Sequence, residues 1–423
     1  MIRKCQELKE NEMHKAFKFR LLPTKEQEVL LAKHFGCSRF IYNHFLSEKQ
    51  KHYLENKETL NFNQCAGNLV AKKKEEEFKW LREVNSQVLI STLMNLETAY
   101  GNFFKKKSKF PKFKSKRNKN SFQIPQHVTL KEHNVVQIPK FKEGLKFVKH
   151  RELKGEIKSA TISKNPTGKY YISILCVIEK PTKHRKTGKS IGIDLGLKDF
   201  LITSEGQRYC NPKFTKKYEV KLARKQRILS RKEKGSKGRD KARLSVAKLH
   251  EKITNSRNDM QHKVSSKLVR DYDLIAIEDL NVKGMVKNHC LAKAISDVAW
   301  SSFVTKLKYK AQWNDKEVIV IDRFYPSSKT CSCCDNVKES LSLDERTWTC
   351  SKCNTIHDRD VNASKNILRR ALAIQSAGTV DNRNGAEVRP KVVSKATKGT
   401  GNEVLKKKGR KYYLEAERSL VAR

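Results

Sequence analysis

Three acidic residues stand where short, rigid segments are expected to end or begin. Asp194 lies in IGIDLG, Glu278 in LIAIEDL and Asp360 in HDRDVNASKN. The first two follow apolar, β-branched runs and the third opens a helical stretch, so each backbone should be held firmly. Carboxylates from separate segments that meet in a fold commonly hold divalent cations against a phosphate, and Mg²⁺ prefers such oxygen ligands. The three acids therefore predict a metal-dependent site for phosphodiester chemistry.

Each acidic motif also has an ordinary structural explanation when it is taken alone. A buried strand often ends in a turn, and an aspartate before a helix is a common N-cap. Two neighbouring acids, Asp279 and Asp358, are rival ligands. Glu278 is preferred because it continues the strand that begins at Leu274, and Asp360 because a helical run follows it directly. The site is favoured by the joint occurrence of the three motifs in a very basic chain.

A second site is predicted from cysteine spacing. Two C-x2-C pairs are separated by fifteen residues and consist of Cys331, Cys334, Cys350 and Cys353. This is the spacing of a structural zinc ribbon with four thiolate ligands, a closed site that supplies no reaction chemistry. Cys333 and His357 are alternative ligands, and chance packing of cysteines is the remaining explanation.

The charge of the chain points to a polyanionic partner. Lys and Arg number 91 against 45 acidic residues, a formal net charge of +46 spread over the whole length. Such a chain repels itself when compact unless a polyanion neutralises it, so we expect binding to nucleic acid. A merely basic protein, for example a ribosome-associated one, is the alternative, and no amphipathic helix favours a membrane surface.

The sequence also favours a cytoplasmic location. No apolar stretch approaches the roughly 20 residues that span a bilayer. The charged start, MIRKCQELKENEMHK, lacks the apolar core of a signal peptide. Thiols stay reduced inside cells, which favours metal binding for closely spaced cysteines.

The first half of the chain predicts a helical block set among strands. Residues 16–22 alternate like a strand, and apolar residues at spacings of three and four predict helices over about 24–105. Residues 105–119 hold nine Lys or Arg and no acid, interleaved with two phenylalanines. We expect this basic loop to contact phosphates and bases, with a solvated linker as the alternative. Its candidate contacts are Lys106, Lys107, Lys112, Lys114, Lys116 and Arg117.

Short strands between 121 and 180 predict a small barrel or sandwich, which the strand at 16–22 would complete. After a linker at 181–190, the order is hairpin, basic helical pair, strand, helix, strand, cysteine cluster and helix. This order is compatible with an RNase H-like α/β core that carries insertions. Residues beyond about 376 lose periodicity and predict a mobile basic tail.

Several long stretches closely resemble the TnpB proteins of bacterial insertion sequences, which are related to the type V CRISPR effectors. The similar segments include GIDLGLKDFLITSEG, IAIEDLNVKGMVKNHCLAKAISDVAW, WTCSKCNTIHDRDVNASKNI and, in the first half, FKFRLLPTKEQE and FGCSRFIYNHFL. The resemblance covers roughly residues 15–390. It implies an RNA-guided DNA endonuclease that pairs a guide RNA from the transposon end with a target, reads a short flanking motif and cuts both strands.

The resemblance implies a multidomain α/β architecture. A small β-barrel wedge domain would be interrupted by a helical recognition domain, and an RNase H-like RuvC nuclease domain would carry a zinc-ribbon insertion. The expected segments are wedge strand 1–23, recognition domain 24–120, the rest of the wedge 121–185, RuvC 186–328, ribbon 329–356, RuvC 357–375 and tail 376–423.

The resemblance also implies residue roles. Asp194, Glu278 and Asp360 would be catalytic and would hold two Mg²⁺ ions, with Mn²⁺ as a substitute, while the four cysteines would hold one Zn²⁺. Further nucleic-acid contacts are expected, for the flanking motif at Phe62, Ser86 and Ile90, and for substrate phosphate at Arg323 and Lys329.

Other functions within and outside this family stay open at the level of sequence. A compact type V CRISPR effector would have the same chemistry with a differently encoded guide. A catalytically silent RNA-guided repressor is opposed by the intact acids, and a transposase would use a similar fold for strand transfer. One nuclease centre that cuts two strands in turn fits a monomer bound to guide RNA and double-stranded target DNA.

Overall fold

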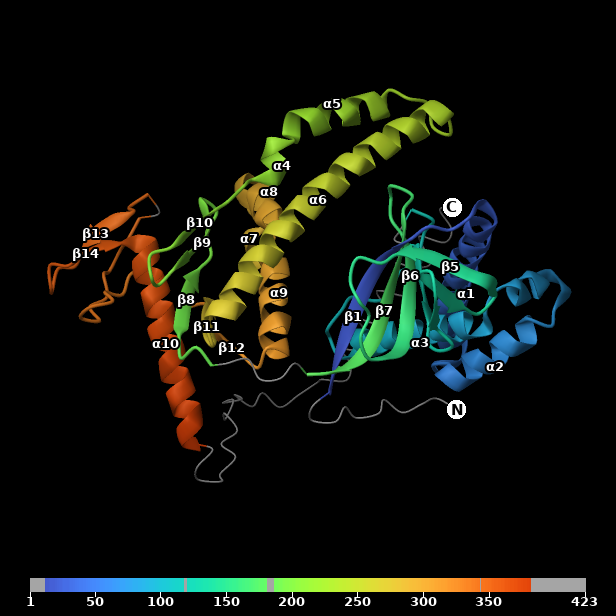
Figure 1. The fold of residues 1–423 in the computed structure, drawn as a ribbon, viewed down its shortest axis with the longest axis horizontal. Coiled ribbons are helices and arrows are strands. Elements are labelled where there is room, and N and C mark those ends of the chain that lie inside the picture. Colours follow the sequence, from blue (N-terminus) through green and yellow to red (C-terminus); the bar gives the residue numbers. More distant parts are fainter. Residues whose placement is uncertain (1–11, 118–119, 181–185, 343, 382–423) are drawn as a thin grey trace. The chain divides into compact units, whose positions relative to one another are not determined.

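The computed structural model describes residues 12–117, 120–180, 186–342 and 344–381. The chain divides into two compact units, one that includes the chain up to Glu179 and one that begins at Lys180 (Figure 1). No helix in the described ranges is long and apolar enough to cross a bilayer.

The first unit is built on one seven-stranded sheet in the order β2-β6-β7-β1-β5-β4-β3. Its strands are β1 Glu12–Leu21, β2 Asn120–Ile124, β3 Thr129–Lys131, β4 Val135–Ile138, β5 Phe141–Val148, β6 Glu156–Lys164 and β7 Tyr170–Glu179. The predicted strand at 16–22 is part of β1, which pairs with β7 over its full length and with β5 at Arg20 and Leu21. No ladder joins the edge strands β2 and β3 within the residues described, so the predicted barrel is not closed by strand pairing.

The helices of the first unit lie between β1 and β2 in the chain, as predicted. They are α1 Lys25–Asn56, α2 Phe62–Lys72, the 3-10 helix η1 Glu76–Glu83 and α3 Ser86–Phe104. Thr24 caps α1 because its side chain accepts the Gln27 N–H, while the Gln27 side chain accepts the Thr24 N–H. Leu31 and Val88 join the core of the sheet, whereas the other faces of α1 and α3 form a separate helical core.

The second unit is built on a five-stranded sheet in the order β10-β9-β8-β11-β12. Its strands are β8 Ser190–Asp194, β9 Asp199–Thr203, β10 Arg208–Cys210, β11 Leu274–Glu278 and β12 Glu317–Ile321. The first three strands pair antiparallel, and β11 pairs parallel with both β8 and β12. The carboxyl ends of β8, β11 and β12 therefore meet at one edge of the sheet.

Helices cover both faces of this sheet (Figure 1). They are α4 Phe214–Lys217, α5 Glu219–Ser230, α6 Lys237–Asp271, α7 Val282–Met285, α8 His289–Val298, α9 Trp300–Trp313 and α10 Arg359–Asp381. Ile275 and Ile277 pack with α6 and α9, whereas Leu274 and Ala276 pack with α10. A strand buried on both faces needs such a continuous apolar run, because its side chains alternate between the two helical layers.

Three predicted helices differ in their limits. The one helix expected between the strands β11 and β12 is instead divided, because Ala299 takes a left-handed conformation with φ 55° between α8 and α9. The first helix of the basic pair is likewise interrupted, at Tyr218. The last helix runs to Asp381 and passes the expected start of the tail at 376, although Gly378, Thr379 and Val380 have low helix propensity. The rest of the expected tail lies outside the described residues.

Candidate active site

The three predicted acids come from two parallel strands and one helix. Ile277 of β11 is in register with Ile193 of β8, so Glu278 and Asp194 are the next residues along neighbouring strands. Asp360 lies in the first turn of α10. This helix packs directly on β8, where a methyl group at Gly192 would lie 2.0 Å from the carbonyl oxygen of Ser364. The fold therefore brings the three segments together at one edge.

The electrostatics of the acids show that they act on one another. Burial raises the pKa of Asp194 to about 6, and the charge of Asp360 adds to this rise. Arg359, the Leu195 N–H and Arg346 oppose it. Burial also raises the pKa of Glu278 to about 7, helped by the charges of Asp194 and Asp279. Crowded carboxylates favour protons or divalent cations, so the edge has the electrostatic character of a metal site.

The spacing of the acids bears on how many ions they could share. Among groups of three or more His, Cys, Asp and Glu side chains in the described parts of the chain, only those containing cysteine have ligand atoms that all lie within 4.8 Å of one another. The three carboxylates therefore do not surround one ion in this arrangement. A site for two ions about 4 Å apart would not require all three carboxylates to meet that closely.

The rival acids have other partners. Asp358 caps α10, because its Oδ1 accepts the Val361 N–H at 3.0 Å, and its Oδ2 accepts from Arg208 at 2.6 Å. The carboxylate of Asp279 is paired with Arg323. These contacts assign both acids to local structure and support the preference for Asp360 and Glu278.

An arginine from the cysteine-rich segment also reaches the acids. Arg346 Nη1 lies 3.5 Å from Asp360 Oδ1. A second arginine, Arg359, donates to the carbonyl of Ser342 in the same segment at 2.7 Å. Sequence reasoning missed Arg346, because one arginine in a chain with so many basic residues carries no distinguishing signal. Its position two residues before the strand tryptophan Trp348 was the only available hint.

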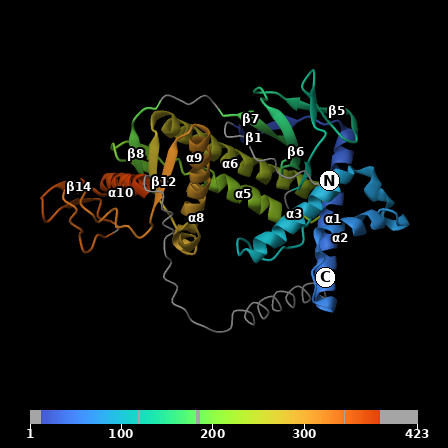
Figure 2. The same ribbon diagram turned by 90° about the horizontal axis from the view of Figure 1, so that it is seen from below.

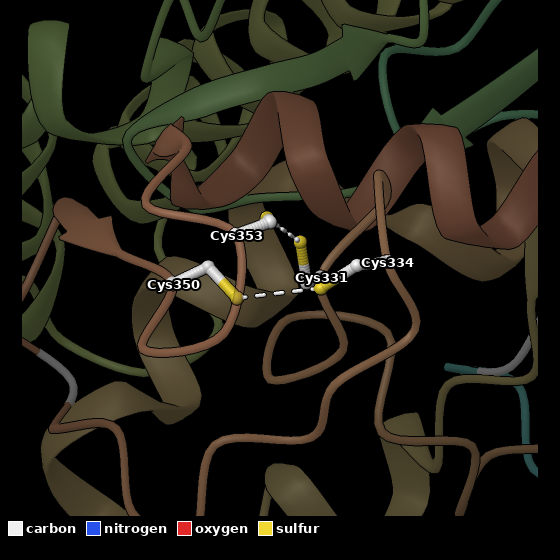
Figure 3. A group of neighbouring side chains, drawn as sticks. All are labelled: Cys331, Cys334, Cys350 and Cys353. Carbon is white, nitrogen blue, oxygen red and sulfur yellow. Dashed lines mark hydrogen bonds between the residues drawn. The ribbon is translucent and has the colours of Figure 1, made fainter.

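The four predicted cysteines form one cluster (Figure 3). Cys331 Sγ lies 3.6 Å from Cys353 Sγ, and Cys334 Sγ lies 3.5 Å from Cys350 Sγ. Sulfur atoms bound at about 2.3 Å around a tetrahedral zinc ion are about 3.8 Å apart, so the cluster fits Zn²⁺.

The two cysteine pairs sit on turns of the same design. Asp335 donates its N–H to the Cys331 carbonyl, and Asn354 donates to the Cys350 carbonyl. Both donors are left-handed, with φ of 61° and 53°. The second turn connects β13 Thr347–Thr349 to β14 Ile356–Asp358, and β14 leads directly into α10 (Figure 2). The ribbon is thus joined to the helix that carries Asp360.

The alternative ligands are also close. Cys331, Cys333 and His357 form a second group, and His357 Nε2 lies 3.0 Å from Cys331 Sγ. Both groups need Cys331, so one ion would use one of them. The four-thiolate set completes a tetrahedron without His357, which is then placed to hydrogen-bond the Cys331 sulfur.

Known proteins are similar over most of the chain. A "Putative RNA-guided DNA endonuclease" of Streptomyces pristinaespiralis is 39% identical over 370 residues, which are 87% of this chain and 92% of that protein. A "TnpB-like protein" of Acanthamoeba polyphaga mimivirus is 30% identical over 229 residues, 51% of this chain and 44% of that one. The chain belongs to the TnpB family.

Family models match three parts of the chain, and one solved structure is similar in fold. The models match as "Helix-turn-helix domain" at residues 13–58, "Probable transposase" at 173–289 and "Cas12f1-like, TNB domain" at 300–367. The solved Cas12f1-sgRNA-target DNA complex has a similar fold over 85% of this chain and 99% of that chain, with a TM-score of 0.51 and 14% identity. These matches support a multidomain α/β fold with a zinc-ribbon-like cysteine cluster.

The predicted loop contacts are exposed lysines and one arginine in the segment after α3. Lys114 fixes this segment to α1, because its N–H donates to Asn43 Oδ1 at 2.7 Å and its Nζ lies 3.8 Å from the centre of the Tyr42 ring. The remaining candidates in the loop, including Lys106 and Lys116, project into solvent and are available to a ligand.

The other predicted contacts have local partners. Phe62 and Ile90 pack partly against the helical core, and Ser86 Oγ accepts from Lys73 at 2.7 Å. Arg323 is paired with Asp279, and Lys329 Nζ donates to the carbonyl of Glu339 at 2.9 Å. Trp300 is 2% exposed and belongs to the core.

Proposed function

We propose that the chain is an RNA-guided DNA endonuclease whose hydrolytic centre is the acidic edge formed by Asp194, Glu278 and Asp360. The observation that carries this proposal is the meeting of these acids at the ends of β8 and β11 and the start of α10. The strand order β10-β9-β8-β11-β12 is that of an RNase H-like, RuvC-type domain. The 39% identical relative is named a putative RNA-guided DNA endonuclease, and this name supports a guide RNA and a DNA target for the chain.

Asp194, Glu278 and Asp360 would hold two Mg²⁺ ions, with Mn²⁺ able to replace them. Bound there, the ions would supply an activated water and a counter-charge for the leaving 3′-oxygen. The chain's own contribution is to hold three acids in a crowded, partly desolvated edge where protons bind more tightly than in water. That same crowding makes cation binding favourable at neutral pH.

Arg346 would help to hold the scissile phosphate. Its guanidinium already lies beside Asp360, and a planar guanidinium matches the oxygens of a phosphate. Asp358 and Asp279 would have positioning roles, since one caps α10 and the other fixes the segment after β12. The ribbon, with one structural Zn²⁺ on the four cysteines, would hold the Arg346 segment in place.

Guide RNA and double-stranded target DNA would be the partners. When base pairing reads the sequence, the protein needs charge and shape more than base-specific side chains. The net charge of +46 and the exposed basic loop suit a protein that binds the nucleic-acid backbone while the guide RNA reads the sequence. The seven-stranded sheet and its inserted helices would serve as the wedge and recognition domains. The protein would act as a monomer in the cytoplasm, near the nucleoid.

The decisive experiment tests the acids within the complete ribonucleoprotein. Purified protein with its copurifying RNA is mixed with Mg²⁺ and a plasmid library that carries a randomised motif beside the target. Asp194→Ala should reduce cutting at least 100-fold while the amount of bound RNA stays the same. Asp259→Asn, which removes an exposed carboxylate paired with Lys263 on α6, is the control and should cut like the wild type.

Two results would contradict the proposal. Undiminished cutting by Asp194→Ala would mean that the acids are wrongly assigned. A wild-type protein that binds the library DNA but never cuts it would instead indicate a catalytically silent repressor. Sequencing the copurifying RNA would separate a transposon-derived guide from a CRISPR guide.

A further inference from the structure

An exposed phenyl ring stands beside the acidic edge. Phe324 is 85% exposed, the largest exposed fraction among the large hydrophobic side chains for which the structure gives burial. It lies in the segment Asp322–Arg323–Phe324–Tyr325 that follows β12. Folding gains nothing from an aromatic ring left in water, so the ring is available to a ligand.

The ring is exposed although the backbone around it is well held. The Phe324 N–H donates to Asp322 Oδ1 at 2.7 Å. The next residue, Tyr325, points the other way and packs against the core between the sheet and α10. The carbonyl of Ser327 then accepts a hydrogen bond from Asn366 Nδ2 of α10 at 2.8 Å. A tightly anchored turn therefore presents Phe324 to solvent.

The turn is also tied to the strand that carries Glu278. Ile321 is in register with Glu278, and the Asp279 N–H donates to the Ile321 carbonyl at 3.2 Å. Arg323 is paired with Asp279. Neighbouring strands are about 4.8 Å apart and three residues span at most about 11 Å, so the Cα atoms of Phe324 and Glu278 are no more than roughly 16 Å apart. One nucleotide beyond the acids would come within reach of the ring.

The surroundings of the ring favour a nucleotide over a protein partner. Its chain neighbours Asp322, Arg323 and Pro326 are exposed and mostly polar, so the chain on either side of the ring adds little apolar surface. Arg323 keeps 41% of its side chain exposed and presents further N–H donors beside the ring. An aromatic face next to a cation is the arrangement that binds a base and its phosphate.

We propose that Phe324 is a stacking platform for a nucleobase of the DNA strand held at the acidic edge. The base would lie on the phenyl face, and its phosphate would contact Arg323. This inference rests on the proposed nuclease function and adds a positioning residue to it. Stacking accepts any base, which suits an enzyme that must cut targets of every sequence.

Single-turnover cutting at saturating enzyme tests the role of the ring. Phe324→Ala should cut about tenfold more slowly, while Phe324→Tyr and Phe324→Trp should restore the rate. Guide RNA binding and the thermal midpoint should not change, because the side chain makes little contact with the fold. Val220→Ala removes another exposed apolar side chain, 80% exposed on α5, and should leave the rate unchanged.

A spectroscopic readout checks stacking directly. Target DNA with 2-aminopurine at successive positions around the cut is bound to ribonucleoprotein that carries Asp194→Ala, so that no strand is cut. One position should lose fluorescence through stacking, and adding Phe324→Ala should restore it. Equal fluorescence with and without Phe324 at every position, or a Phe324→Ala enzyme that cuts at the wild-type rate, would overturn the inference alone. A cutting Asp194→Ala enzyme would overturn the nuclease assignment instead.

Discussion

At the scale of single residues, the acidic edge differs from the ion pairs elsewhere in the chain. Asp194 and Glu278 form no ion pair of their own among the described residues, whereas Asp279 and Asp358 have arginine partners. Burial raises the pKa of both carboxyl groups, and the charge of Asp360 adds to the rise at Asp194 while that of Asp194 adds to the rise at Glu278. The crowded edge therefore stores unfavourable charge that a divalent ion would relieve.

This stored charge predicts how stability depends on pH. An ordinary aspartate has a pKa near 4, while burial raises the pKa of Asp194 to about 6. Between these values the folded state holds a proton that the unfolded state has released, so stability is lost as pH rises. Without divalent ions, Asp194→Asn should melt at the wild-type temperature at pH 4 and a few degrees higher at pH 8.

Thermal melts of zinc-loaded protein at several pH values, with and without Mg²⁺, measure this effect. Mg²⁺ should raise the melting temperature of the wild type at pH 8 and leave that of Asp194→Asn almost unchanged. Asp279→Asn is the matched control and should bring no gain at pH 8, because that carboxylate already has a cationic partner. If wild type and Asp194→Asn differed in melting temperature by the same amount at pH 4 and at pH 8, the charge of Asp194 would not be the cause of the difference.

At the scale of elements, the site depends on how closely α10 lies on β8. Gly192, two residues before Asp194, leaves room for the backbone of α10 at Ser364 and for Leu368. Asp360 lies one helical turn before Ser364, so its distance from Asp194 is set by this contact. A glycine within an apolar strand thus serves the geometry of the acids.

Adding one methyl group at Gly192 tests this dependence. The new carbon would lie 2.0 Å from the Ser364 carbonyl oxygen and 2.8 Å from Leu368 Cβ, so α10 would have to shift. Gly192→Ala should destabilise the protein by about 1–3 kcal/mol and slow cutting more than tenfold. Gly101→Ala is the control, because nothing lies within 4 Å of the added carbon in α3, and it should keep full activity. Chemical denaturation and cutting rates would decide, and a fully active, stable Gly192→Ala would contradict the proposed spacing role.

At the scale of the whole molecule, charge is the dominant property. The excess of 91 basic over 45 acidic residues runs through both units. Many lysines pair with acids, but those of the basic loop, such as Lys106 and Lys112, lie in solvent. We expect the unpaired lysines to supply most of the affinity for RNA, because contact with phosphates releases counterions.

The salt dependence of RNA binding measures these contacts. Each lost phosphate contact lowers the slope of log affinity against log salt by about 0.7 for single strands. Replacing four loop lysines with glutamine should therefore lower the slope for the copurifying RNA by up to about 3; the four are Lys106, Lys107, Lys112 and Lys116. The control replaces four lysines that are paired with acids, namely Lys79, Lys158, Lys263 and Lys293. Equal slopes for the two variants would show that the loop does not bind RNA.

Short sequence patterns alone determined the cysteine cluster and several secondary-structure elements of this protein. The spacing of Cys331, Cys334, Cys350 and Cys353 is enough to predict the zinc cluster, since each pair closes within its own turn. The apolar run before Glu278 likewise predicts β11, because a strand buried on both faces must be apolar throughout.

Tertiary structure alone decided the contacts between distant segments. Arg346 reaches Asp360 only because the ribbon hairpin leads into α10, and Phe324 stands at the acidic edge only because β12 lies beside β11. Neither residue differs locally from other arginines and phenylalanines in the sequence. The sheet of the first unit also stays open between β2 and β3 among the described residues, which strand patterns could not predict. Such contacts depend on how many distant segments pack together, and no short sequence pattern determines that packing.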